Sequence, residues 1–143
     1  MVGQAESPFD AHWESFEAFR DEVRQHRILL GVDRGFARQW MLRGGARCPR
    51  VAQLAAYLLV ALAVTSVAST IYAVLYAAYL LAVFLLLSAY VSWRLFVHLA
   101  IANVRSVALR DEALFRRWFD ERRLSVLIKA TGEYVWNDRA APS

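Results

Sequence analysis

The fold is decided by residues 51–93, which read VAQLAAYLLVALAVTSVASTIYAVLYAAYLLAVFLLLSAYVSW. These forty-three residues include no Asp, Glu, Lys or Arg, and no Gly or Pro. One helix needs about 20 predominantly apolar residues to cross a bilayer, so the stretch is about twice the length of one crossing. As a soluble hairpin it would leave neither helix with a polar face toward water. We therefore expect two transmembrane helices.

The turn between the two helices is expected where polar residues interrupt the stretch. Hydroxyl side chains gather within residues 65–70, which predicts helices over about 50–67 and 71–93 joined by a tight turn. Arginines precede the first helix and follow the second, and the turn carries no charge, so the positive-inside rule places both termini in the cytoplasm. These arginines are Arg43, Arg47, Arg50, Arg94, Arg105 and Arg110.

The segments outside the hairpin are short and mixed in charge. The sequence divides into a cytoplasmic amphipathic helical segment (1–48), a transmembrane hairpin (49–104) and a cytoplasmic segment (105–143). Neither flank is long enough to bury a substantial core alone, which favours docking onto the membrane or a partner. The net charge is +4, and residues 1–50 hold eight Arg against seven acids, which argues against nucleic-acid binding. The first residues lack the pattern of a cleavable signal peptide.

The N-terminal segment reads as an amphipathic helix that begins at Ser7-Pro8 and ends near Leu30-Gly31. Its apolar positions include Trp13, Phe16 and Phe19, with acids on the opposite face. Anionic lipid would repel those acids, so we expect the aromatic side chains to bind a groove on a partner protein.

A second short helix is expected from Arg34 to Leu42, ended by Gly44-Gly45. Arg34 and Arg38 have the R-x-x-x-R spacing of receptors for cyclic dinucleotides, but the second half of that motif is missing. We therefore interpret the two arginines as a solvated helix face.

Two patterns in the hairpin predict how its helices pack. Ala52/Ala56 and Ala78/Ala82 are small-residue pairs that let helices approach closely. An aromatic row on the second helix is interpreted as a packing seam; it comprises Tyr72, Tyr76, Tyr79, Tyr90 and Trp93. The apolar span holds no ionisable side chain, which argues against a proton relay, a voltage sensor or an ion carrier.

The C-terminal segment predicts a helix within 111–123 followed by a β-hairpin, with strands at 124–129 and 134–137 around a turn at 130–133. The buried face of that helix is expected to hold Leu114, Phe115, Trp118 and Phe119. The fold class is therefore a mainly α membrane protein: a two-helix transmembrane hairpin with amphipathic N-terminal helices and a small cytoplasmic α+β unit.

No catalytic constellation can be assembled from the sequence. The three histidines lack metal-ligand spacing, and no Gly-rich phosphate loop or nucleophile elbow is present. The single cysteine, Cys48, excludes an internal disulfide. We expect a non-catalytic membrane subunit without a metal or bound cofactor.

The arginines after the second helix are the candidate ligand site. Arg105, Arg110, Arg116 and Arg117 are expected just beyond the inner membrane face, and guanidinium groups suit phosphate recognition. Arg117 and Asp120 also fit the short R-x-x-D pattern of cyclic-di-GMP inhibitory sites. The alternative is ordinary helix-surface charge that contacts lipid.

Residues 49–135 resemble the PgaD-type small auxiliary subunit of the bacterial poly-β-1,6-N-acetylglucosamine synthase. The resemblance rests on the membrane hairpin, on Trp93-Arg94-Leu95-Phe96 as the exit from the membrane, and on the tail. The matching tail residues are Leu109, Asp111, Glu112, Leu114 or Phe115, Arg123-Leu124-Ser125-Val126 and Gly132. The chain departs from the family in its short outer turn and its longer N-terminal segment.

This resemblance implies a regulatory or assembly subunit in the bacterial inner membrane. The implied partner is a family-2 glycosyltransferase that makes a biofilm polysaccharide from UDP-N-acetylglucosamine, and the implied allosteric ligand is cyclic di-GMP. Partner contacts would come from Trp13, Phe16, Phe19, Trp93, Phe115 and Trp118. Two alternatives stay open: a two-helix effector that oligomerises into a pore, and a structural subunit of another membrane complex.

Overall fold

The computed structural model describes residues 9–10, 12–45 and 47–135. The chain forms two compact units. The sheet unit combines both ends of the chain, Met1–Asp33 and Arg105–Ser143, and the hairpin unit comprises Arg34–Val104. The two flanks that the sequence separated into 1–48 and 105–143 thus contribute to one folded unit.

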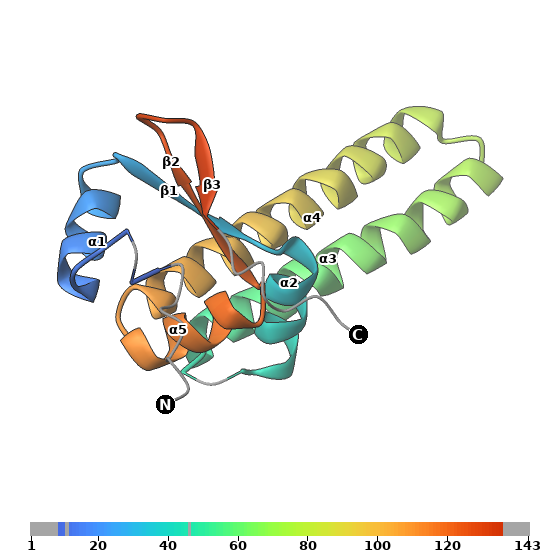
Figure 1. Ribbon diagram of the computed structural model, residues 1–143. Helices are drawn as coiled ribbons and strands as arrows, with labels where there is room; N and C mark the ends of the chain where they lie inside the picture. The colour runs from blue at the N-terminus through green and yellow to red at the C-terminus, as the bar shows by residue number, and fades with distance from the viewer. Residues whose placement is uncertain (1–8, 11, 46, 136–143) are drawn as a thin grey trace, which may run out of the picture. The chain divides into compact units, whose positions relative to one another are not determined.

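The hairpin unit is built around two long antiparallel helices, α3 (Arg50–Leu75) and α4 (Tyr79–Ala108) (Figure 1). Both are long and apolar enough to cross a membrane. The turn lies at residues 76–78, so the prediction of a turn at 68–70 was wrong. Thr70 remains helical because its hydroxyl donates to the carbonyl of Ser66 at 2.8 Å, which satisfies the polar group without leaving the helix.

Small side chains, not the aromatic row, lie between α3 and α4. Ser66 Oγ and Ser88 Oγ form a hydrogen bond of 3.4 Å across the pair. The four tyrosines of the aromatic row are all more than 60% exposed, so the prediction that they form the packing seam was wrong. Small residues allow closer backbone approach, which is how helices gain contact in a lipid environment. The buried small residues are Ala56, Ala63, Ser66, Thr70, Ala73, Ala82, Ala89 and Ser92.

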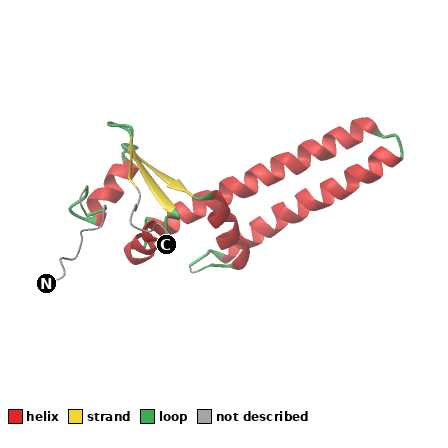
Figure 2. Ribbon diagram, turned by 45° about the vertical axis from the view of Figure 1, so that its right-hand side comes forward, coloured by secondary structure: helices red, strands yellow, loops and turns green. Residues whose placement is uncertain are grey.

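The sheet unit contains a three-stranded antiparallel sheet in the order β1-β2-β3 (Figure 2). The strands are β1 (Ile28–Val32), β2 (Leu124–Ile128) and β3 (Glu133–Val135). The predicted β-hairpin is confirmed over the described residues; positions 136–137 lie outside them. The strand β1 was not predicted, because its apolar run continues the pattern of the preceding helix.

Three further helices have the following bounds: α1 (Phe16–Arg24), α2 (Arg34–Arg43) and α5 (Glu112–Asp120). The predictions of α2 and α5 are confirmed. The helix α1 is shorter than expected: Ser15 caps its first turn, and the chain leaves the helix before β1. The predicted start at Ser7-Pro8 lies outside the described residues.

An aromatic cluster fills the core between α1 and α5. The ring of Phe19 lies 4.9 Å from that of Phe115 and 5.2 Å from that of Phe9, and all three side chains are at most 1% exposed. The aromatic residues predicted to bind a partner are part of this core, so their large apolar surface is already covered within the chain. This corrects the assignment for Trp13, Phe16, Phe19, Phe115 and Trp118.

The sheet unit is an internal repeat of a helix and a strand, with equivalent residues 96 positions apart. Ser15 and Asp111 cap the two helices, and Phe19 and Phe115 are their central buried rings. His26 and Arg122 end the helices with the same left-handed φ of 57°.

Hydrogen bonds follow the same offset of 96 residues. The N–H of Arg27 donates to the carbonyl of Glu22, and the N–H of Arg123 donates to that of Trp118, as in a Schellman motif. Because β1 and β2 pair antiparallel about Leu30 and Val126, the two halves are related by a pseudo-two-fold axis.

Candidate functional site: a cationic pocket on the hairpin unit

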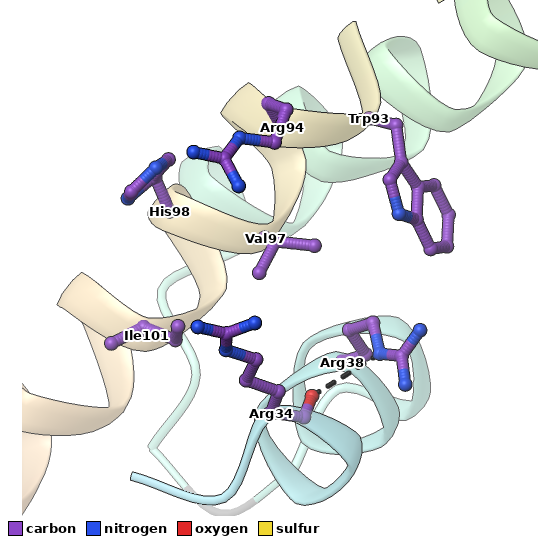
Figure 3. Close-up of a pocket in the computed structure, with 7 residues that line it drawn as sticks. All are labelled: Arg34, Arg38, Trp93, Arg94, Val97, His98 and Ile101. Atoms are coloured by element: carbon purple, nitrogen blue, oxygen red, sulfur yellow. Dashed lines mark hydrogen bonds between the residues drawn. The ribbon is translucent and has the colours of Figure 1, made fainter. Parts of the chain in front are cut away.

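The most chemically distinctive pocket lies between α2 and α4 within the hairpin unit (Figure 3). It has a volume of about 340 Å³. Arg34 and Arg38 line it from α2, and Arg94 lines it from α4. The remaining lining residues are Trp93, Val97, His98 and Ile101. The guanidinium of Arg34 extends toward α4, whereas that of Arg38 turns toward Trp93 and the imidazole of His98 points away from α2 (Figure 3).

The spacing of helical residues explains why α4 contributes its polar groups together. Arg94, Val97, His98 and Ile101 recur at intervals of three and four, which places them on one face of the helix. This face follows the apolar stretch directly, so the pocket stands at the end of the part of α4 that could lie in a membrane.

The charge of this pocket is not balanced inside its own unit. Residues 34–104 contain six arginines and no Asp or Glu. The nearest carboxylate in the sequence is Asp33, which directly precedes Arg34 at the boundary of the unit; the unit itself holds none. Guanidinium groups brought together in this way repel one another, and an anion placed among them relieves that repulsion. The arrangement suits a phosphate group, which accepts two parallel hydrogen bonds from one guanidinium.

Trp93 gives the pocket an aromatic wall. The guanidinium carbon of Arg38 lies 5.7 Å from the centre of the Trp93 ring, and Arg38 Nε donates to the carbonyl of Arg34 at 3.2 Å. These contacts fix the orientation of the Arg38 side chain. Trp93 is 41% exposed, so its indole still presents surface on which a planar base can stack.

The arginines selected from the sequence have a different environment, in the sheet unit. Arg116 donates to Glu112 and to Asp10, each at 2.9 Å, and Arg117 donates to Glu121 at 2.9 Å. The hydrogen bond to Glu112 is the main cause of the raised pKa of Arg116, and Asp10 acts in the same direction. Two of the four predicted ligand contacts are thus engaged in ion pairs within the chain.

The other two predicted arginines, Arg105 and Arg110, are exposed on the last turns of α4 and just after it. The structure describes no ion pair for either of them. Their role as phosphate contacts stays a prediction.

Two of the pocket residues, Arg34 and Arg38, were identified from the sequence but interpreted as a solvated helix face. The R-x-x-x-R spacing of Arg34 and Arg38 was visible, but Arg94 and His98 lie more than fifty residues later in the chain. The available signal was the absence of Asp and Glu from residues 34 to 104.

Cys48 lies near the start of α3 and shows no sign of reactivity. Its Sγ is 3.7 Å from the sulfur of Met41, and partial burial raises the pKa of the thiol. A raised pKa leaves less thiolate at neutral pH, so the residue is a weak nucleophile. Within the described ranges, no three His, Cys, Asp or Glu side chains are grouped to hold a metal ion.

Comparisons with known proteins give no relative: no family model, no curated protein and no solved structure matches this chain.

Proposed function

We propose that this chain is a non-catalytic regulatory subunit of an inner-membrane polysaccharide synthase, and that the cationic pocket is its ligand site. The observation that carries the proposal is the convergence of Arg34, Arg38 and Arg94 on one pocket, in a unit without a carboxylate. Repulsion among the three guanidinium groups destabilises the pocket until an anion binds. Binding would therefore favour the arrangement of α2 and α4 that surrounds the ligand.

The proposed ligand is cyclic di-GMP, which combines the two chemical features that the pocket offers. Its phosphates match the guanidinium groups, and its guanine bases match the exposed face of Trp93. The resemblance to PgaD-type subunits implies the same ligand, although the arginines selected from the sequence were different. An anionic lipid headgroup shares the phosphate chemistry but offers no base for Trp93.

The proposed partner is a family-2 glycosyltransferase that polymerises UDP-N-acetylglucosamine. The hairpin supports an assembly role, since α3 and α4 expose large apolar side chains along most of their length. In a bilayer these side chains would contact lipid or the helices of the enzyme. Both termini are proposed to lie in the cytoplasm, where the nucleotide ligand and the sugar donor are found.

Affinity purification of the tagged chain from bacterial inner membranes tests the partnership. The expected result is a multi-spanning glycosyltransferase that incorporates UDP-N-acetylglucosamine into polymer only when this chain is present. The synthase is then assayed in vesicles of neutral lipid and in vesicles with anionic lipid. Activation by cyclic di-GMP in both supports the nucleotide, whereas activation by anionic lipid alone assigns the pocket to a headgroup. A purified chain that conducts ions through bilayers without an enzyme would replace the proposal by the pore-forming effector.

A further inference from the structure

We propose that β1 is the docking edge for a second copy of this chain, with the two β1 strands pairing antiparallel across a two-fold axis. The sheet order β1-β2-β3 makes β1 an edge strand. Two copies joined in this way would form one continuous sheet in the order β3-β2-β1-β1-β2-β3. The inference concerns the sheet unit alone and is independent of the cationic pocket.

The backbone of β1 directs alternate residues toward β2. The carbonyl of Arg27 accepts from Lys129 at 3.1 Å, and the N–H of Asp33 donates to Arg123 at 3.0 Å. In an antiparallel ladder the intervening even-numbered residues therefore point their N–H and C=O groups to the opposite side. In the part of the chain that the structure describes, no strand pairs with these groups of Ile28, Leu30 and Val32.

The internal repeat shows what is missing at this edge. The equivalent edge of β2 is covered by β3, which pairs with Val126 through Val135 and with Ile128 through Glu133. The counterparts of Val126 and Ile128 in the other half are Leu30 and Val32. No strand equivalent to β3 follows β1 in the first half of the repeat, because the chain enters α2 at Arg34.

The edge of β1 also lacks the features that keep edge strands apart. Its residues, ILLGV, include no charge and no proline. Soluble proteins usually protect such an edge with a lysine, a proline or a bulge. Leu29 adds an apolar side chain that is 43% exposed on the face away from the aromatic core.

The sequence of β1 is complementary to itself in one register. When Leu30 lies opposite Leu30 of the second copy, Ile28 lies opposite Val32, and the hydrogen-bonding groups of both strands face each other. The same register places Leu29 opposite Gly31, a large side chain beside a small one.

The charges on either side of β1 agree with this register. Arg27 would lie opposite Asp33 of the second copy, and Asp33 opposite its Arg27. These are non-hydrogen-bonded positions, where Cα atoms approach to about 4.5 Å and side chains interact most closely. A shift by two residues would lose both charge pairs. This self-complementarity favours a second copy over a strand of unrelated sequence.

Directed cross-linking tests the register in the full-length chain. In a Cys48→Ser background, Arg27→Cys and Asp33→Cys are prepared as separate variants with different tags and mixed in lipid vesicles. We expect disulfide-linked dimers that carry both tags when the two variants are mixed. Neither variant should link to itself, because the two identical cysteines of such a dimer lie six residues apart along the paired strands, or about 20 Å at 3.3 Å per residue. Arg24→Cys on α1 is the matched control and should link to neither. Equal self-linking by each variant, or no linking in the mixture, would overturn the proposal.

A charge substitution gives an independent measurement that needs no disulfide. Arg27→Glu places like charges at both ends of the paired strands, and we expect the dissociation constant of the dimer to rise roughly tenfold. Arg24→Glu alters the same net charge away from the edge and should leave association unchanged. Analytical ultracentrifugation in detergent compares the two, and thermal unfolding confirms that both variants are folded. Equal association of the two variants would show that β1 does not form the interface.

Discussion

The guanidinium carbon of Arg38 lies 5.7 Å from the centre of the Trp93 ring, which connects α2 to α4 inside the hairpin unit. This contact depends on the planar guanidinium as well as on its charge, because an ammonium group cannot stack in the same way. The contribution of such a contact is about 0.5–1 kcal/mol at an exposed site. The pair therefore fixes the position of the Arg38 guanidinium and adds modestly to stability.

Replacing Arg38 by Lys separates stacking from charge. The charge remains, but the planar stacking and the paired hydrogen bonds to phosphate are lost, so we expect cyclic di-GMP to bind the synthase complex about tenfold more weakly. Isothermal titration calorimetry on the purified complex gives the dissociation constant. Arg24→Lys on α1 is the control. An unchanged affinity in Arg38→Lys would mean that only net charge matters at this position.

Arg116 and Arg117 should differ in their effect on stability although they are neighbours. Arg116 joins Asp10 and Glu112 and lies with its guanidinium carbon 5.2 Å from the centre of the Phe9 ring, whereas among the described residues Arg117 pairs with Glu121 alone. We expect Arg116→Ala to lower the free energy of unfolding by about 0.5–1 kcal/mol, since its ion pairs are half-exposed, and Arg117→Ala to be nearly neutral. Thermal unfolding followed by tryptophan fluorescence measures both. Equal melting temperatures would show that the ion pairs of Arg116 with Asp10 and Glu112 do not stabilise the sheet unit.

His26 offers a stabilising substitution. Its φ of 57° is a left-handed conformation that costs a non-glycine residue about 1 kcal/mol, and its side chain is exposed. We expect His26→Gly to raise the melting temperature of the sheet unit, as is usual where glycine ends a helix. Gln25→Gly, one residue earlier at a negative φ of −77°, is the control and should lower it. A melting temperature that falls in both variants would argue against the left-handed helix end.

Ala63 and Ala68 test the packing of α3 against α4. Ala63 is 8% exposed at the contact, whereas Ala68 lies on the outer face of the same helix. A leucine at position 63 would have to displace side chains at the helix contact, so we expect Ala63→Leu to destabilise the hairpin by about 1–3 kcal/mol. Ala68→Leu should have little effect. Resistance to unfolding by SDS compares the two variants, and equal resistance would place the helix contact elsewhere.

The elements that the sequence predicted well are those with local signals. The helix α5 begins at Asp111, an N-cap residue that accepts from the N–H groups of Ala113 and Leu114, and β2 and β3 surround a short turn. The strand β1 was missed because its partner lies about ninety-six residues away, so no local pattern reveals the pairing. The turn of the hairpin was misplaced because Ser66 and Thr70 satisfy their hydroxyl groups inside the helix contact.

The candidate site was harder to predict than the fold for a related reason. The clustering of arginines after the second helix pointed to Arg116 and Arg117. Clustering in the sequence does not show which arginines form ion pairs in the fold. The pocket depends on a tertiary contact between α2 and α4. Composition could still have suggested it, because no acid occurs between Asp33 and Asp111.

The concentration of cyclic di-GMP that gives half-maximal polymer synthesis tests the central claim most directly. The purified complex of this chain with its glycosyltransferase is assayed at fixed salt with UDP-N-acetylglucosamine as substrate. Each charge-assisted hydrogen bond contributes about 1.5–3 kcal/mol, so Arg38→Ala and Arg94→Ala should each raise that concentration by at least about tenfold. Arg24→Ala, outside the pocket, should leave it unchanged. Activation curves for Arg38→Ala and Arg94→Ala that coincide with that of the unmodified complex would contradict the account.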